Sequence, residues 1–318
     1  MLYINKQVID EVCDHKELVS IIEKTMGLYE TGNFTQPDRI TVNRGDKETY
    51  LYMPCFTDEV KGTKILTLYA DNAPKGIPTI QGLMLLNDPE TGKIKAIIEG
   101  STLTAYRTGA VGSCGIKHTT PSDVSKLGII GSGIQGFYQS IYACQLRDIK
   151  EISVFDIFSD KAQDFKERLQ KELPNVIITV RDSVEELLEN SEVIITVTTS
   201  PKPVLPNNPD LLRGKHFIGI GSYKPTMQEF PQALFELLDE VYIDVDFAKH
   251  ETGDLINPLR EGWIKEEQVT TLGKCLNKEL NVKNTTLYKS VGMALFDIEV
   301  GEYIYNQAIK ANKGICLE

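Results

Sequence analysis

The stretch LGIIGSGIQGF, residues 127–137, decides the fold. An apolar run leads directly into Gly131, Gly133 and Gly136, which have the spacing GxGxxG, and the segment IQGFYQSIYACQL follows with a helical pattern. A strand, a glycine turn and a helix in this order form the phosphate-binding turn of a dinucleotide-binding βαβ unit. The next predicted strand ends in Asp156, twenty residues after Gly136. Such units place the acid that binds a ribose at about this distance.

Each glycine of this turn has its own role. Gly131 permits the tight turn, Gly133 lets the backbone approach a pyrophosphate, and Gly136 lets helix and strand pack closely. The free N–H groups and the partial positive charge at the start of the helix favour the phosphates. The turn therefore predicts six cofactor-binding residues: Gly131, Ser132, Gly133, Ile134, Gln135 and Gly136.

Asp156 decides which dinucleotide this turn favours. A carboxylate at that position accepts hydrogen bonds from a ribose diol and repels a 2′-phosphate. The residues that follow it, IFSDK, include no arginine that would hold such a phosphate. The sequence therefore predicts NAD(H) in preference to NADP(H).

The chain around the turn reads as an α/β domain. From Val124 onward, the runs KLGIIG, EISVFD, VIITVR, EVIITVTT, HFIGIG and EVYIDV are short and rich in Ile and Val. Most of them alternate with helical segments such as SDKAQDFKERLQKEL. This alternation predicts a parallel sheet with helices on both faces, which is the Rossmann architecture.

The N-terminal third has a different pattern. Residues 16–30 place apolar side chains at helical spacing, and Gly32 follows as a stop signal. Residues 49–100 contain four short β-rich runs separated by turn signals, which predict a mostly antiparallel sheet. The segment 101–118, STLTAYRTGAVGSCGIKH, then predicts a helix.

The two ends of the chain are expected to form one domain. Residues 286–311 read as a long helical stretch that cannot extend the parallel sheet, so we expect it to return to the N-terminal domain. The predicted fold class is α/β, with a Rossmann dinucleotide-binding domain at 122–286. This domain is inserted into an α+β substrate domain made of 1–121 and 287–318.

Composition excludes several classes of partner. The chain has 318 residues, of which 41% are hydrophobic and 25% charged, and its formal net charge of −11 provides no basic surface for nucleic acid or an anionic membrane. No apolar stretch approaches the roughly 18 residues of a membrane span. The six cysteines and four histidines show no metal-ligand spacing. The N-terminus MLYINKQVIDEV carries charges where a signal peptide needs an apolar run, so we expect a cytoplasmic protein with reduced thiols.

Three basic residues of the first domain are candidates for the chemistry. Arg107 lies on the apolar stripe of its predicted helix, and a buried guanidinium needs a carboxylate, supplied either by a substrate or by an internal ion pair, unless its side chain extends to solvent. Lys64 begins an apolar β-rich run and is either a strand-end residue reaching solvent or a desolvated acid/base with a lowered pKa. Arg39, between a turn and a strand, gives no signal by itself.

The chain resembles the ornithine cyclodeaminase/mu-crystallin family along nearly its whole length. The resemblance runs in order through YLYMPCF, TKILTLYA, NDPETGKIKAIIEGSTLTAYRTGAVGS, IIGSGIQG, EVIITVTT, ETGDL and KSVGMALFD, of which YRTGA and KSVGMA are the more specific. It implies a Rossmann domain inserted into a substrate domain that also forms a homodimer. Four β-rich runs are too few to close a core alone, which favours the same assembly.

The resemblance also implies roles for the three basic residues. Arg39 and Arg107 would clamp the α-carboxylate of the substrate, and Lys64 would lie beside the reacting nitrogen or α-carbon. Two guanidiniums suit a carboxylate, because each can bind it with paired hydrogen bonds.

Further cofactor contacts are implied by the same resemblance. Thr108 matches a position that contacts cofactor phosphate, and Thr79 and Gln81 match a stretch near the nicotinamide. Val197 and Thr198 would close the cofactor groove, and the segment around Gly292 would pass near the nicotinamide. No metal is implied.

The chain departs from the cyclodeaminases at two carboxylates. Leu51 stands where they have a glutamate before Met53-Pro54, and Tyr223 stands where they have an aspartate after the fifth Rossmann strand. Those acids serve the second amine of ornithine and its proton transfers. Their replacement resembles the cyclic-imine reductases, in which Tyr223 would line the ring pocket; whether its hydroxyl also donates a proton is left open by the sequence.

These observations predict an NAD(P)H-dependent oxidoreductase that reduces a small, cyclic α-imino carboxylate such as Δ1-pyrroline-2-carboxylate to the amino acid. Amino-acid oxidation, as in an alanine dehydrogenase, would use the same groups in reverse. Ornithine cyclodeaminase, which forms proline and ammonia, is the alternative reaction. A non-catalytic, mu-crystallin-like protein that binds NAD and a ligand is the alternative of another class. A dehydrogenase that forms opines or diamino acids would need a further basic group, for which Lys224 is the candidate.

Overall fold

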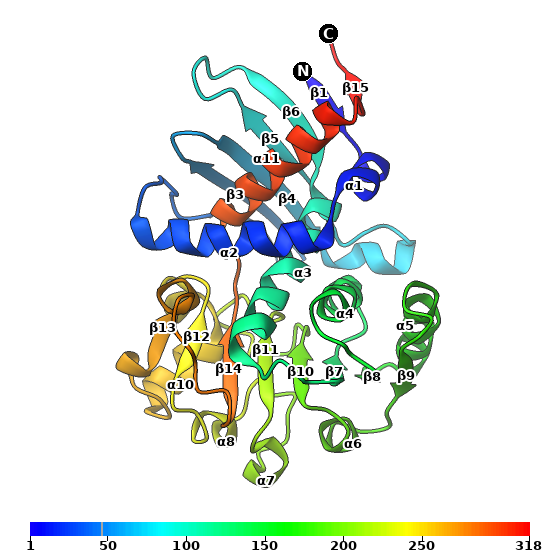
Figure 1. Ribbon diagram of the computed structural model, residues 1–318, viewed down its shortest axis with the longest axis vertical. Coiled ribbons are helices and arrows are strands. Elements are labelled where there is room, and N and C mark those ends of the chain that lie inside the picture. The colour runs from blue at the N-terminus through cyan, green and yellow to red at the C-terminus, as the bar shows by residue number, and fades with distance from the viewer. Residues whose placement is uncertain (46) are drawn as a thin grey trace. The chain divides into compact units, whose positions relative to one another are not determined.

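The computed structural model describes residues 1–45 and 47–318. The chain forms two compact units, of which the first combines Met1–Arg107 with Met293–Glu318 and the second is Thr108–Gly292 (Figure 1). The junctions therefore follow residues 107 and 292, whereas the sequence placed them after 121 and 286. The first difference arises because helix α3 (Gly100–Thr119) is continuous across the junction and the sequence pattern assigns it whole to one domain.

The first unit is built on a seven-stranded sheet in the order β15-β1-β6-β5-β4-β3-β2. Strands β2 to β6 pair antiparallel in succession, and β1 joins β6 in parallel. The strands are β1 (Leu2–Ile4), β2 (Ile40–Arg44), β3 (Glu48–Phe56), β4 (Lys61–Tyr69), β5 (Ile80–Asn87), β6 (Ile94–Glu99) and β15 (Ile315–Cys316). The helices are α1 (Lys6–Val12), α2 (His15–Thr31) and α11 (Ala294–Lys310), with a 3-10 turn at Ala70–Lys75.

One face of this sheet is buried. Helix α11 packs against β3, β4, β5 and β6, and α2 packs against α11 (Figure 1). Because side chains alternate along a strand, Met53 of β3 and Lys64 of β4, which pair across the strands, both point to the covered face. Lys64 is therefore held inside the core rather than at a solvent-facing strand end.

The second unit contains an eight-stranded parallel sheet in the order β13-β12-β14-β11-β10-β7-β8-β9. The strands are β7 (Lys126–Ile130), β8 (Glu151–Phe155), β9 (Ile177–Val180), β10 (Val193–Thr196), β11 (His216–Gly219), β12 (Val241–Ile243), β13 (Val269–Thr271) and β14 (Thr286–Lys289). The helices are α4 (Ile134–Leu146), α5 (Ser159–Glu172), α6 (Val184–Glu189), α7 (Pro209–Leu212), α8 (Gln232–Phe235), α9 (Ala248–Glu251) and α10 (Gly253–Glu261). Two 3-10 turns span Glu266–Gln268 and Leu272–Cys275. The predicted fold class, an inserted Rossmann domain, is confirmed.

The start of the predicted C-terminal helix is wrong. Residues 286–289 form strand β14, which lies between β11 and β12 and extends the parallel sheet. The four residues, TLYK, are all buried, and a segment this short has no periodicity that would distinguish a central strand from a helix. Helix α11 begins only at Ala294, after the bend at Gly292.

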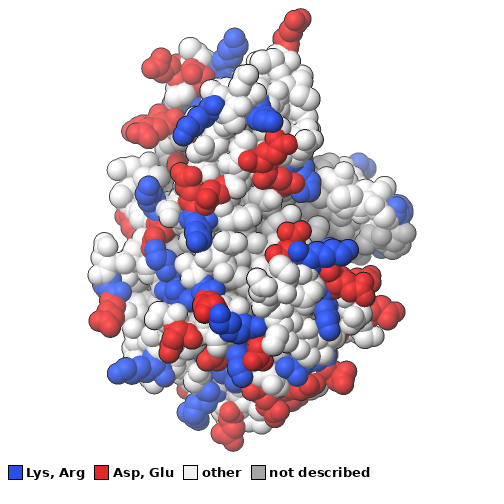
Figure 2. Space-filling model, turned by 45° about the vertical axis from the view of Figure 1, so that its right-hand side comes forward, with Lys and Arg blue, Asp and Glu red and all other residues white. Residues whose placement is uncertain are grey.

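Charge is dispersed over the face of the molecule seen in Figure 2, where acidic and basic side chains are interspersed. None of the helices in the described ranges is both long and apolar enough to cross a bilayer.

Candidate functional site

The glycine turn has the geometry of a phosphate-binding loop. Gly131, directly after β7, has φ +107°, a conformation that side chains disfavour, and Gly133 caps the start of α4. A Cβ on Gly136 would collide with the carbonyl oxygen of Gly131. At Gly133, by contrast, no described atom lies within 4 Å of the position a Cβ would take. The turn is thus packed on the protein side and open where a pyrophosphate would approach.

Asp156 lies beside this turn, at the end of β8. Its Oδ2 accepts hydrogen bonds from the backbone N–H and the hydroxyl of Ser132 at 2.8 and 2.7 Å. Its Oδ1 accepts from the N–H of Phe158 at 3.0 Å. The carboxylate therefore shapes the glycine turn in addition to the ribose contact that the sequence predicts for it.

Other predicted cofactor residues lie in loops of the same unit. Val197 and Thr198 follow β10, and the N–H of Val197 donates to Ile130 at 3.0 Å, next to the turn. Gly292 follows β14 with φ +74°. The carbonyl of Thr108, on α3, accepts from the Gln139 side chain at 2.7 Å. Two of the described cofactor candidates belong to the first unit: Thr79, an exposed residue preceding β5, and Gln81, an exposed residue on β5.

Asp244, which the sequence reading missed, fixes the Gly292 loop. Its carboxylate accepts hydrogen bonds from the Ser290 hydroxyl at 2.6 Å and from the N–H groups of Val291 and Gly292 at 3.1 and 2.7 Å. It is fully enclosed, and burial raises its pKa, while the donors of Ser290, Gly292 and Val291 oppose that rise. The sequence feature that could have revealed Asp244 is its place in EVYIDV, where an acid directly follows an apolar strand.

The first unit contains a buried cluster of opposite charges. Asp297, in the first turn of α11, lies 2.6 Å from the amine of Lys64 through Oδ2 and 2.9 Å from Nε of Arg107 through Oδ1. The side chains of Lys64 and Asp297 are 1% and 0% exposed, so both charges are removed from solvent. Three elements, β4, α3 and α11, thus meet at one carboxylate.

Lys64 has the electrostatics of an acid/base group. The pKa of Lys64 is lowered to about 7, chiefly by burial and also by the positive charges of Arg107 and Arg39, while Asp297 opposes this decrease. The sequence left open whether Lys64 reaches solvent at a strand end or is a desolvated acid/base. The structure shows that it is desolvated. Lys64 and Arg107 contact one carboxylate, and Arg39 adds a third positive charge that acts on Lys64, so the cluster favours an anionic ligand when Lys64 is protonated.

Asp297 is the main residue of this cluster that sequence reasoning missed. It lies within the quoted motif KSVGMALFD, among neighbours that are all buried. An acid at a buried helical position needs a cationic partner, and that was the signal available. The internal ion pair considered for Arg107 is therefore present, through Nε of the guanidinium.

The two departures from the cyclodeaminases fall in different units. Leu51 is buried on β3, opposite Leu66 of β4, on the same face of the sheet as Lys64. Tyr223 is half-buried after β11, and the Lys224 amine lies 5.5 Å from the centre of its ring. Lys224 thus lies over an aromatic ring.

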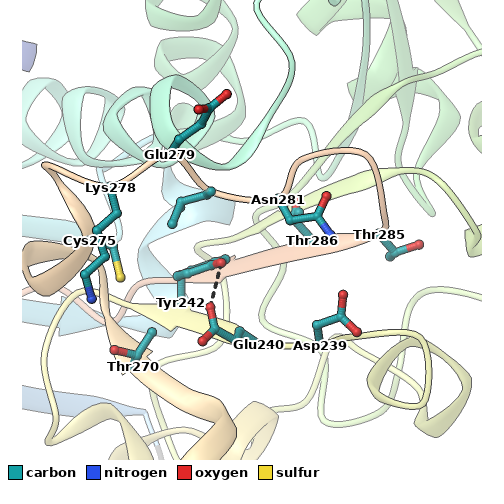
Figure 3. Close-up of a pocket in the computed structure, with 11 residues that line it drawn as sticks. Asp239, Glu240, Tyr242, Thr270, Cys275, Lys278, Glu279, Asn281, Thr285 and Thr286 are labelled. Carbon is teal, nitrogen blue, oxygen red and sulfur yellow. Dashed lines mark hydrogen bonds between the residues drawn. The ribbon is translucent and has the colours of Figure 1, made fainter.

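A separate pocket of about 420 Å³ lies at the opposite edge of the parallel sheet (Figure 3). Asp239 and Glu240 precede β12, and Thr285 precedes β14, so this pocket lies near the amino ends of those strands. Rossmann cofactors bind at the carboxyl ends of the strands. None of the predicted site residues lines the pocket.

Comparison with known proteins identifies the family. The family model for the ornithine cyclodeaminase/mu-crystallin family matches residues 1–312. The chain belongs to this family. It is 32% identical to a Δ1-pyrroline-2-carboxylate reductase of Bacillus thuringiensis subsp. konkukian over 283 residues, which cover 86% of each protein.

Solved structures of this family share the whole fold. Thermococcus litoralis Δ1-pyrroline-2-carboxylate reductase, in complex with NADH and L-proline, is 29% identical and superposes with a TM-score of 0.93 over 100% of both chains. An archaeal alanine dehydrogenase dimer with bound NAD is 26% identical, with a TM-score of 0.90 over 100% of this chain and 99% of that one. The resemblance inferred from the motifs is confirmed.

The buried cluster predicts a large effect on stability. Asp297→Asn would leave Arg107, which cannot lose its proton, without its anionic partner in the core. We expect the free energy of unfolding to fall by about 3–5 kcal/mol, measured by denaturant unfolding at pH 7.

A matched control exists on the same helix. Glu302 pairs with Lys95 at 2.7 Å, but these side chains are 19% and 17% exposed. Glu302→Gln should therefore cost less than about 1 kcal/mol. Equal losses for the two variants would show that Asp297 does not hold an isolated buried cluster.

Proposed function

We propose that this chain is an imine reductase that converts a small cyclic α-imino carboxylate, such as Δ1-pyrroline-2-carboxylate, into the amino acid with NAD(H). The observation that carries the proposal is the buried lysine with a pKa near 7 beside an excess of guanidinium charge. Its relatives named above are oxidoreductases acting on C=N or amine groups, and the chain shares that class.

Arg39 and Arg107 would bind the substrate carboxylate. Asp297 engages Arg107 through Nε, so the ion pair orients the guanidinium and leaves its two terminal nitrogens to form paired hydrogen bonds with a carboxylate. Arg39 lies just before β2 and is close enough for its charge to depress the pKa of Lys64. A bound carboxylate would balance the positive charge of this cluster.

Lys64 would supply the proton. Reduction of a C=N bond adds a hydride to carbon and a proton to nitrogen, and bound NADH supplies the hydride. An ammonium with a pKa near 7 is present at neutral pH and gives up its proton readily, which suits a general acid. Asp297, 2.6 Å from the Lys64 amine, would hold the ammonium in place and stabilise its charged form.

The second unit would bind the cofactor. The open side of Gly133 and the N-terminus of α4 fit a pyrophosphate, and Asp156 fits a ribose diol. Val197 and Thr198 lie at the carboxyl end of the neighbouring strand β10. We further propose that Thr108, Thr79 and Gly292 contact the cofactor as the family resemblance implies.

Two residues favour a cyclic imine over ornithine. Leu51 places an apolar side chain where the cyclodeaminases have a glutamate, so a second ammonium group would find no counter-charge at that position. Tyr223 offers an aromatic surface in place of an acid. We propose that both select a ring without a second amine.

A homodimer is part of the proposal. The uncovered face of the first unit's sheet carries apolar residues that stay partly exposed in the single chain, among them Ile40, Val42, Tyr52, Phe56 and Leu83. An apolar surface of this kind is typical of a subunit interface. We also propose a cytoplasmic location, in which the six free cysteines would remain reduced.

A turnover assay tests the function. Purified protein with NADH should consume Δ1-pyrroline-2-carboxylate and form proline, because the site has a carboxylate clamp and a proton donor. It should release no ammonia from L-ornithine with NAD⁺, since Leu51 and Tyr223 stand where the cyclodeaminases have their two carboxylates. Ammonia release with proline formation would favour ornithine cyclodeaminase over an imine reductase. NADH binding without turnover of any cyclic imine or L-amino acid would favour a binding protein.

The cofactor preference has its own test. Asp156→Ala removes the charge that would repel a 2′-phosphate, so the ratio of kcat/KM for NADH to that for NADPH should fall at least about tenfold. Ser132→Ala is the control, because it removes one bond to Asp156 and leaves the carboxylate in place. It should change both cofactors alike. A wild-type enzyme that already prefers NADPH would contradict the assignment.

A further inference from the structure

A fully buried carboxylate, Glu229, joins two loops at the carboxyl edge of the parallel sheet. Its Oε1 accepts hydrogen bonds from the N–H and the hydroxyl of Thr198 at 2.7 and 2.8 Å. Its Oε2 accepts from the Thr196 hydroxyl and from the N–H groups of Gly221 and Ser222 at 3.0 to 3.1 Å. One side chain therefore fixes the ends of β10 and β11 to each other.

The backbone of Glu229 is fixed by a second buried acid, Asp254, which lies close to the buried Lys289. Asp254 accepts hydrogen bonds from the N–H groups of Glu229 and Phe230 at 2.7 and 3.1 Å. The buried amine of Lys289 lies 3.6 Å from Asp254 and 3.3 Å from the carbonyl oxygen of Gly219. Burial raises the pKa of Glu229, and the positive charge of Lys289 opposes that rise. A network of two acids and one lysine thus sits under these loops.

The network continues to the glycine turn. Val197 precedes Thr198, and its carbonyl oxygen lies 3.0 Å from the position a Cβ would take on Gly131. On the other side, a Cβ on Gly221 would collide with the backbone of Thr198. The loops are therefore packed against each other and against the turn, with little room to shift.

We infer that Glu229 is a positioning residue for the dinucleotide: it holds the Val197–Thr198 loop at the spacing from the glycine turn that the cofactor requires. The inference rests on the proposed function, because it concerns the same cofactor site. Glu229 acts through Thr198 and does not itself touch the cofactor. Five donors converge on one carboxylate, so no neutral side chain of the same shape reproduces the arrangement.

The test is the dissociation constant of NADH, measured by fluorescence without substrate. Glu229→Gln presents an amide N–H₂ to backbone donors, so the loops should separate and NADH should bind at least about tenfold more weakly. KM for NADH should rise with it, while KM for the imine should change less than about twofold. Thermal unfolding checks that the variant is folded.

Glu192 provides the matched control. It too is a carboxylate that accepts backbone N–H groups, from Ser125 and Lys126 at 2.7 and 2.9 Å, but it lies at the amino edge of the same sheet. Glu192→Gln should leave NADH affinity unchanged. If Glu229→Gln does not fold, Thr196→Val removes one buried bond to Glu229 and should weaken NADH about threefold.

The outcomes separate this inference from the proposed function. NADH affinity within twofold of the wild type in a folded Glu229→Gln variant, or equal weakening in Glu192→Gln, would overturn the positioning role. If Glu229→Gln does not fold, unchanged NADH affinity in Thr196→Val would overturn it. A wild-type protein that binds no NADH would overturn the proposed function itself.

Discussion

The ion pair between Asp297 and Lys64, shared with Arg107, is the constraint on which the first unit depends. A lysine and an arginine inside an apolar core are costly unless a carboxylate meets them. Asp297 meets both, at 2.6 and 2.9 Å, and it can do so only if α11 lies across the sheet that carries Lys64. The C-terminal helix and the N-terminal sheet are therefore tied by charge as well as by apolar packing.

The second unit uses carboxylates in a related way, to fix loops rather than to tune a base. Asp156 holds the glycine turn, Glu229 joins the loops after β10 and β11, and Asp244 holds the loop after β14. All these loops follow the carboxyl ends of parallel strands, where dinucleotides bind in this architecture. Backbone N–H groups that donate to these carboxylates are preorganised, so binding a cofactor need not order them.

Local sequence was sufficient to predict the cofactor-binding turn but not the buried cluster of Lys64, Arg107 and Asp297. The glycines and Asp156 lie within thirty residues of one another and follow a spacing fixed by the chemistry of a pyrophosphate. Lys64 and Asp297 are more than 200 residues apart, so their meeting depends on tertiary packing that no local pattern encodes. The strand β14 was misread for a related reason: a four-residue segment is compatible with either a strand or a helix until its neighbours β11 and β12 are known.

The central claim is that Lys64 is a proton donor whose pKa has been brought near neutrality by burial and guanidinium charge. The most direct measurement is the pH dependence of kcat/KM in both directions, for imine reduction and for proline oxidation. Reduction needs the ammonium, so its rate should fall as pH rises through about 7, and oxidation, which needs the free amine, should rise over the same range. Neither of these two changes of rate near pH 7 should remain in the residual activity of Lys64→Met. A change of rate centred near 10.5, the ordinary pKa of lysine, would contradict the account, as would a pH profile that is unchanged in Lys64→Met.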